Sequence, residues 1–280
     1  MEVKKIGIVF SGGLARGVAQ LAFANEIVKQ IGIDRIAFVS GSSIGALNAY
    51  SLSCGTQEKL LKFYSGSELN SLLSFKKAVK NGLMMDAFKV GGRAEMRFPT
   101  YVSASRLFPL DVYYYNLNCV TKNDLPKILN LSMSFPFLNG PKLFNGRFYL
   151  DGGTADNVPI YPAEYFDLDM IIVIHCYPKY YPSSKFLKKD RIFIDVDCTL
   201  EMDRGITPFS IDKYSIDKMI SIGSRQGKLF AKEIFKDFDY DNLRQRCFDY
   251  TIAHIQKRKE KSAGMLALVE YANALFSFKD

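Results

Sequence analysis

The stretch GSSIGALNAY, residues 41–50, joins a short apolar run to a helical pattern through a Gly-x-Ser-x-Gly turn. The run RIAFVS at 35–40 predicts a buried strand, and small apolar residues over 44–53 predict a helix. A serine on a sharp strand-to-helix turn stands above the sheet, where helix amides favour a developing negative charge. Ser43 is therefore a candidate nucleophile, although a tight turn that needs glycine explains the pattern almost as well.

A second glycine-rich turn, SGGLARG at 11–17, follows the predicted strand KIGIVF at 5–10. Its GGLARG core lacks the G-x-G-x-x-G spacing of a dinucleotide-binding loop. Consecutive glycines instead let backbone N–H groups crowd toward one point, as an oxyanion hole requires, and each such donor is worth about 10²–10³ in rate. Arg16 either adds positive charge there or pairs at the surface.

A carboxylate flanked by glycines occurs in DGG at 151–153, after a predicted hairpin around KLFNGRFYL at 142–150. Such a carboxylate can approach another group closely because no bulky neighbour blocks it. On its own the tripeptide is equally well explained as an ordinary Asp-Gly turn.

The remaining patterns predict an α/β fold. Strand and helix patterns alternate in the N-terminal third, as in parallel βα units. The further predicted elements are strands at 170–175 and 191–197, a β-rich stretch at 109–120, and helices at 16–31, 124–133, 216–235, 243–257 and 263–278. A lysine-rich helix is predicted after Thr56 as N-cap, and residues 66–110 read as an insertion or lid. One domain over 1–280 is expected, with a core at about 5–200 and helices at about 212–280.

Composition limits the classes of function. The chain has 280 residues, 48% of them hydrophobic, and neither a signal peptide nor a membrane-spanning stretch is recognised, so a soluble cytoplasmic protein is expected. Five scattered cysteines without a C-x-x-C spacing predict neither disulfides nor a zinc site. The formal charge of +8 favours an anionic partner, and a membrane surface is preferred to nucleic acid because no nucleic-acid-binding motif accompanies the charge.

The motifs GGLARG, GSSIG and DGG, in this order and context, resemble those of the patatin-like phospholipase family. Two weaker similarities support this: LSMSFPFL at 131–138 resembles the segment A-S-x-A-x-P-x-x-F, and DGGTADNVP at 151–159 resembles D-G-G-x-x-x-N-x-P. A helix with Gly223 after the last strands is also similar to bacterial members. The resemblance spans roughly residues 5–235 and implies a three-layer α/β/α sandwich with a mainly parallel sheet and a helical C-terminal part.

The resemblance also implies a catalytic site. Ser43 corresponds to the nucleophile and Asp151 to the general base of a Ser-Asp dyad, which needs no cofactor or metal. The implied oxyanion hole consists of Gly12, Gly13 and the backbone of Leu14. Arg16 corresponds to the basic residue beside the oxyanion hole, which is implied to bind the substrate. The implied activity is hydrolysis of carboxylic esters in lipids, as a phospholipase A, lysophospholipase or esterase, with phospholipids, lysophospholipids or other fatty acyl esters as substrates.

Two departures from the family pattern concern the substrate pocket. Leu14 stands where the family commonly has a third glycine, and a leucine side chain strains any conformation with φ above zero. Leu131 and Phe135 stand where smaller residues are usual.

Two other functions remain open from the sequence. The order Ser43, Asp151, His175 would suit an α/β-hydrolase triad, although His175 at a strand end and His254 on a helix face are more simply explained as structural. A lipid-binding protein that keeps the fold without turnover is the other alternative, and Leu14 favours it. The apolar face that includes Met265, Leu268, Leu275 and Phe276 is a candidate peripheral membrane contact, or else packs on the core.

Overall fold

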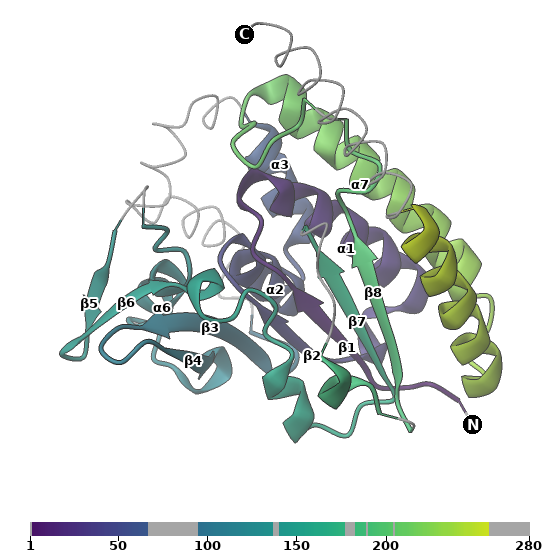
Figure 1. Cartoon of the computed structure of the whole chain (residues 1–280), viewed down its shortest axis with the longest axis horizontal. Coiled ribbons are helices and arrows are strands. Elements are labelled where there is room, and N and C mark those ends of the chain that lie inside the picture. The colour runs from purple at the N-terminus through teal and green to yellow at the C-terminus, as the bar shows by residue number, and fades with distance from the viewer. Residues whose placement is uncertain are drawn as a thin grey trace, which may run out of the picture.

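A mixed sheet forms the centre of the fold (Figure 1). The computed structural model describes residues 2–66, 95–136, 140–176, 183–188, 190–203 and 205–257. Among these residues the sheet has eight strands in the order β5-β6-β3-β2-β1-β7-β8, and β4 pairs with β3. The strands are β1 (Ile6–Phe10), β2 (Ile36–Gly41), β3 (Thr100–Arg106), β4 (Asp111–Asn116), β5 (Lys142–Phe144), β6 (Arg147–Asp151), β7 (Met170–His175) and β8 (Ile192–Asp197).

The parallel part of the sheet comprises β3, β2, β1, β7 and β8. Strands β1 and β7 are apolar and buried on both faces, which is the expected composition of strands at the centre of a parallel sheet. The strands predicted at 5–10, 35–40, 170–175 and 191–197 are confirmed to within a residue or two.

Strand β3 has an unusual arrangement of partners. Its residues 101–106 pair antiparallel with β4 along one edge. The other edge is shared: β2 runs parallel to its first half and ends at Gly41 opposite Val102, while β6 runs antiparallel to its second half and ends at Asp151 opposite Ala104. The carboxyl ends of β2 and β6 therefore face each other across two positions of β3.

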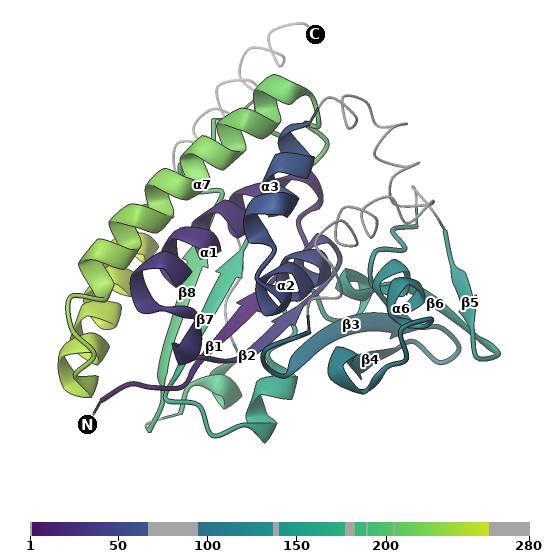
Figure 2. The same cartoon turned by 180° about the vertical axis from the view of Figure 1, so that it is seen from behind.

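Helices cover one face of the sheet, as Figure 2 shows for α1, α2, α3 and α7. The α-helices in the described ranges are α1 (Gly17–Ile31), α2 (Ile44–Cys54), α3 (Gln57–Ser65), α6 (Leu125–Ser132) and α7 (Lys213–Ile234), followed by a helix at 240–257. None of the helices in the described ranges combines the length and the apolar character needed to cross a bilayer.

The long helix α7 packs closely against α1 because two glycines face it. A Cβ atom on Gly223 would lie 2.3 Å from the carbonyl oxygen of Ala19, and one on Gly227 would lie 2.6 Å from that of Phe23. The rings of Phe23 and Phe230 then meet at 5.3 Å. The spacing of four residues places both glycines on one face of α7, so the helix backbones can touch.

The opposite face of the sheet is covered more thinly. Its apolar residues pack mainly against the 3-10 turn Tyr161–Tyr165 and the adjoining loops. The predicted α/β/α architecture with a mainly parallel sheet is confirmed, with this second layer built from short turns in the described part of the chain.

Some sequence-based expectations need correction. Strand β3 lies within residues 66–110, where no regular pattern was recognised, because its small polar residues alternate weakly. Thr56 does not cap α3 through its side chain; its hydroxyl donates to the carbonyl of Ser51 at 3.3 Å instead. Most of the expected lid, the helix at 263–278 and its apolar face lie outside the described residues. The single-domain organisation stays a prediction.

Candidate active site

Ser43 occupies a strained turn between β2 and α2. Its backbone has φ 55° and ψ −127°, a conformation that residues with a side chain rarely adopt. The flanking glycines are required by close contacts: a Cβ on Gly41 would lie 2.0 Å from the carbonyl oxygen of Gly45, and one on Gly45 would lie 2.5 Å from that of Ser11. The turn therefore lifts the Ser43 hydroxyl out of the sheet at the N-terminus of α2.

The hydroxyl of Ser43 donates a hydrogen bond to Oδ2 of Asp151 at 2.6 Å. The other carboxylate oxygen of Asp151 accepts from the N–H of Gly153 at 2.8 Å. Only 4% of Asp151 is exposed, and the shared edge of β3 explains why two residues from distant strands meet. The structure thus brings together the serine and the carboxylate that the sequence singled out.

Burial raises the pKa of Asp151 from its ordinary value of 3.8 to about 6, and the hydrogen bonds from Ser43 and Gly153 offset this effect only in part. Desolvation destabilises the charged carboxylate, so the proton is held more tightly. A base with a pKa near 6 is ionised at neutral pH and still basic enough to accept a proton.

The loop of residues 12–14, called the oxyanion loop below, lies beside Ser43. The Gly12 N–H already donates to the carbonyl of Asn157 at 3.1 Å, whereas the N–H groups of Gly13 and Leu14 have no acceptor among the described residues. A Cβ on Gly13 would lie 2.7 Å from Cβ of Cys176, so only glycine fits there. Of the three expected oxyanion donors, Gly13 and Leu14 have N–H groups free for this role.

Leu14 adopts a positive φ of 49°. This is the conformation that the glycine of the family pattern would enter without strain, since a Cβ atom crowds the backbone at positive φ. Leu14 therefore stands in a backbone conformation that favours glycine.

A cavity of about 830 Å³ adjoins these groups. All six residues that the sequence predicted for the site line it: Gly12, Gly13, Leu14, Arg16, Ser43 and Asp151. Much of the remaining wall is apolar, with Phe135, Pro136, Val158, Ile160, Phe186 and Pro208 among its residues. A cavity of this size with apolar walls and few polar groups is typical of a small-molecule site.

Arg16 lines the cavity but is anchored to its rim. One guanidinium nitrogen, Nη2, donates to the carbonyl of Ile206 at 3.1 Å. Its buried Nε has no hydrogen-bond partner among the described residues. The side chain therefore brings a fixed positive charge to the edge of the cavity.

Two further residues support the site and were not singled out from the sequence. The Ser43 N–H donates to the hydroxyl of Ser132 at 3.1 Å. The side chain of Asn157 fits between two glycines, because Cβ atoms on Gly12 and Gly153 would lie 2.4 and 2.6 Å from its Oδ1. Both residues belong to the weaker similarities noted above, the segment 131–138 and the asparagine of DGGTADNVP, which were the available signals.

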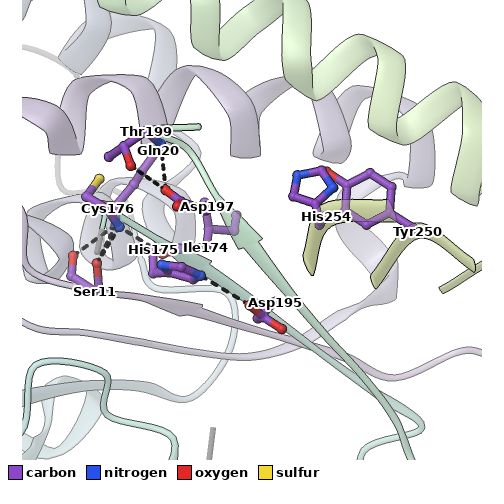
Figure 3. A network of polar contacts seen from close by, with 10 residues as sticks. All are labelled: Ser11, Gln20, Ile174, His175, Cys176, Asp195, Asp197, Thr199, Tyr250 and His254. Carbon is purple, nitrogen blue, oxygen red and sulfur yellow. Dashed lines mark hydrogen bonds and ion pairs between the residues drawn. The ribbon is translucent and has the colours of Figure 1, made fainter. Parts of the chain in front are cut away.

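The two histidines are engaged elsewhere (Figure 3). His175 is fully buried, and its Nε2 lies 3.3 Å from Oδ2 of Asp195. His254 contacts the hydroxyl of Tyr250 at 3.0 Å and stacks on its ring. Neither histidine lines the cavity.

The described residues contain no group of three or more His, Cys, Asp or Glu side chains placed to hold a metal ion. Four of the five cysteines are buried as free thiols. Burial raises the pKa of Cys176, the thiol at the cavity wall, well above its ordinary value. This thiol is accordingly protonated and unreactive at neutral pH.

The mainly parallel sheet, with a glycine-flanked serine at the turn between β2 and α2, defines an α/β protein with a Gly-x-Ser-x-Gly strand–turn–helix unit. Residues 8–164, more than half of the chain, match the family model described as patatin-like phospholipase. The chain therefore belongs to the patatin-like phospholipase family, a family of lipid acyl hydrolases.

Two solved structures are similar to the chain at low sequence identity. Human GIVD cytosolic phospholipase A2, solved with methyl gamma-linolenyl fluorophosphonate, matches with a TM-score of 0.52 and 10% identity over 92% of this chain. The match covers 60% of the human chain, so this protein spans well under the full length of that relative. VipD from Legionella pneumophila matches with a TM-score of 0.43 and 13% identity over 81% of this chain and 67% of VipD.

Proposed function

We propose that the protein hydrolyses carboxylic esters of fatty acyl lipids, as a phospholipase A, lysophospholipase or esterase, through a dyad of Ser43 and Asp151. The single observation that carries the proposal is the 2.6 Å hydrogen bond between the two side chains at the wall of the cavity. A nucleophile within hydrogen-bond reach of a positioned base is the arrangement that covalent catalysis requires.

The first half of the reaction forms an acyl enzyme. Asp151 accepts the Ser43 proton as Oγ attacks the ester carbonyl carbon, and the carbonyl oxygen becomes an oxyanion. The proton then passes from Asp151 to the leaving alkoxide, so the C–O bond breaks and an alcohol departs. Ser43 is left esterified by the acyl chain.

The second half regenerates the serine. Asp151 takes a proton from a water molecule, whose oxygen attacks the acyl carbon. The tetrahedral intermediate collapses, the proton returns from Asp151 to Ser43 Oγ, and a fatty acid leaves. The reactants of this scheme are the ester and one water molecule.

The N–H groups of Gly13 and Leu14 stabilise the oxyanion in this proposal. Both residues line the cavity, and the described residues offer neither N–H an acceptor. Donors fixed before the reaction need no rearrangement when charge develops, and each is worth about 10²–10³ in rate. The Gly12 N–H contributes instead to holding the loop, through Asn157.

The apolar wall of the cavity supports a fatty acyl substrate. Burying an acyl chain gains about 0.8 kcal/mol for each CH₂ group removed from water. Family membership and the human relative, which was solved with a linolenyl fluorophosphonate, favour the same class of substrate.

Two alternatives are less well supported. A Ser-Asp-His triad would need an imidazole at Asp151, whereas His175 contacts Asp195 and is fully buried. A lipid-binding protein without turnover is favoured by Leu14, but the loop keeps positive φ at that residue and the dyad keeps its hydrogen bond.

We also propose peripheral contact with anionic membranes through the edge of the sheet at β5 and β6. Leu143 and Phe148 are opposite each other in the β5–β6 pair and are 64% and 49% exposed. Phe108, 83% exposed, lies nearby because the N–H of Leu107 donates to the carbonyl of Phe148. The exposed Arg147 adds a cation to this apolar surface, and β6 leads directly to Asp151.

The contact surface is tested with vesicles. Replacing Phe108 and Phe148 by Asp should reduce co-sedimentation with phosphatidylglycerol vesicles without affecting hydrolysis of a water-soluble ester. Replacing Phe248 and Ile252, which are 60% and 43% exposed on the helix 240–257, by Asp is the control that adds the same charge elsewhere. Equal losses of vesicle binding in the two variants would reject this surface as the membrane contact.

The catalytic proposal is tested by labelling with a fluorophosphonate probe and by a panel of phospholipids, lysophospholipids and nitrophenyl esters. The expected results are one label per chain and hydrolysis of at least one acyl ester in the panel. An unlabelled protein that binds lipid without turnover would favour the binding function instead.

A further inference from the structure

The hydroxyl of Ser11, the residue between β1 and the oxyanion loop, is completely buried. Its Oγ lies 2.7 Å from the carbonyl oxygen of Gly12, 3.0 Å from the amide nitrogen of Cys176 and 3.0 Å from Nε2 of Gln20. The last two groups can only donate. The single proton of the Ser11 hydroxyl is therefore directed to the carbonyl of Gly12.

Gln20, on the first turns of α1, contacts Ser11 and fixes its hydroxyl (Figure 3). Its Nε2 faces three oxygens: the carbonyl and hydroxyl of Ser11 at 3.1 and 3.0 Å and the carbonyl of Ile174 at 3.0 Å. Its Oε1 accepts from Nδ2 of Asn48 at 3.2 Å. Since every neighbour of Nε2 is an acceptor and the neighbour of Oε1 is a donor, the amide has one favourable orientation.

These contacts determine where the Gly13 N–H points. Within a trans peptide the carbonyl of one residue and the N–H of the next point in opposite directions. Ser11 holds the Gly12 carbonyl toward the interior, on the side of Gln20, so the Gly13 N–H is turned to the other side. Gly13 lines the cavity together with Ser43, and its N–H has no acceptor among the described residues. The hydrogen bond from the Gly12 N–H to Asn157 restrains the preceding peptide.

We propose that Ser11 and Gln20 are positioning residues that aim the Gly13 N–H at the oxyanion. They act through the peptide between Gly12 and Gly13 and do not touch the substrate. The inference rests on the proposed function, because an oxyanion forms only if Ser43 attacks an ester. It adds two buried polar residues, neither of them in the cavity wall, to the machinery of the site.

The test compares kcat and KM of Ser11→Ala with those of the wild type on a short-chain nitrophenyl ester. We expect kcat to fall about 10- to 100-fold with KM within about threefold, because an oxyanion donor stabilises the transition state far more than the bound substrate. Gln20→Met, which keeps the side-chain volume and removes the N–H groups, should shift kcat in the same direction. The double variant should be little worse than Ser11→Ala alone, since both changes release the same peptide.

Ser40→Ala is the matched control. Ser40 is equally buried, and its hydroxyl also donates to a backbone carbonyl, that of Pro159 at 2.6 Å. It does not contact the oxyanion loop, so its kcat should stay near that of the wild type. The midpoint of the pH–rate profile should be unchanged in every folded variant, because Asp151 is intact.

A folded Ser11→Ala protein with kcat within threefold of Ser40→Ala, or with a change confined to KM, would overturn the inference. If Ser11→Ala does not fold, Gln20→Met decides by the same criteria. Failure of the proposed function is recognised separately, because then the wild type itself is neither labelled by the fluorophosphonate nor active.

Discussion

The carboxylate of Asp151 accepts a hydrogen bond from the hydroxyl of Ser43 at 2.6 Å, although the two residues are 108 positions apart in the sequence. The contact arises because β2 and β6 end facing each other on one edge of β3. Close backbone contacts also require glycine at Gly41 and Gly45 on either side of Ser43 and at Gly152 after Asp151. The predictions below follow from this pair and its surroundings.

Ser43→Ala should lower esterase activity at least about 10⁴-fold and abolish fluorophosphonate labelling, because the nucleophilic oxygen is removed. Ser42→Ala is the adjacent control. The Ser42 hydroxyl is buried without a hydrogen-bond partner among the described residues, so its removal should leave activity intact and thermal stability equal or higher. Persistent labelling of Ser43→Ala would contradict the assignment.

Activity should fall as pH is lowered through about 6, where Asp151 takes up a proton and can no longer accept one from Ser43. Asp151→Asn should lose nearly all activity at every pH, since an amide is not a base. The measurement is a profile of kcat/KM against pH on an ester that does not itself ionise. An acid limb well below pH 5 would show that the active-site base is a solvated carboxylate, not a buried one.

Asp151→Asn should also raise the free energy of unfolding at neutral pH. The folded-state pKa of Asp151 is raised from 3.8 to about 6, so the folded state binds its proton more tightly and loses stability as pH rises through this window. The full effect above pH 6 corresponds to roughly 3 kcal/mol. Denaturation curves should show Asp151→Asn more stable than the wild type at pH 8, with the difference vanishing below about pH 4. A constant difference across this range would exclude the titration of Asp151 as its cause.

A His175→Gln, His254→Asn double variant should keep most of the activity. A dyad does not use an imidazole, whereas a triad loses its proton acceptor. Gln is chosen at position 175 because its amide can reach Asp195 as the Nε2 atom of His175 does. A folded but inactive double variant would favour the α/β-hydrolase triad.

Leu14→Gly should retain activity and change the free energy of unfolding by no more than about 1 kcal/mol, because relief of strain at φ 49° is offset by the greater freedom of glycine when unfolded. Leu14→Val should be clearly less stable, since a β-branched side chain fits poorly at positive φ. If the wild type were inactive and Leu14→Gly gained activity, the leucine would be identified as the block in a lipid-binding protein.

The local parts of the site were predictable from the sequence. The turn around Ser43, the oxyanion loop and the turn at Asp151 each have their glycines within a few residues. Close contacts in the structure require these glycines, so the local sequence pattern was enough to indicate them. What the sequence could not provide was the engagement of the Gly12 N–H by Asn157, or the buried bonds of Ser11 and Gln20. These depend on segments brought together only by tertiary packing, and a buried glutamine on a helix has no distinctive spacing.

Parts of the fold were likewise predictable from the sequence, and other parts were not. Strands β1 and β7 were recognised because both faces are apolar, whereas β3 was missed. Its sequence, TYVSASR, has two serines at alternate positions, and both are buried and donate hydrogen bonds to backbone carbonyls of the segment 151–156. The polar residues that prevented recognition of β3 are therefore explained by their hydrogen bonds to this backbone segment.

Because β2 and β6 share one edge of β3, catalytic activity depends on the correct register of both strands. A slip of β6 by one residue would turn the Asp151 side chain to the other face of the sheet, and a slip by two would carry it about 7 Å away from Ser43. Neither misaligned form would greatly alter the overall content of helix and strand. During refolding, recovery of ester hydrolysis would therefore report that β2 and β6 both have their native register against β3. Circular dichroism would hardly detect this step.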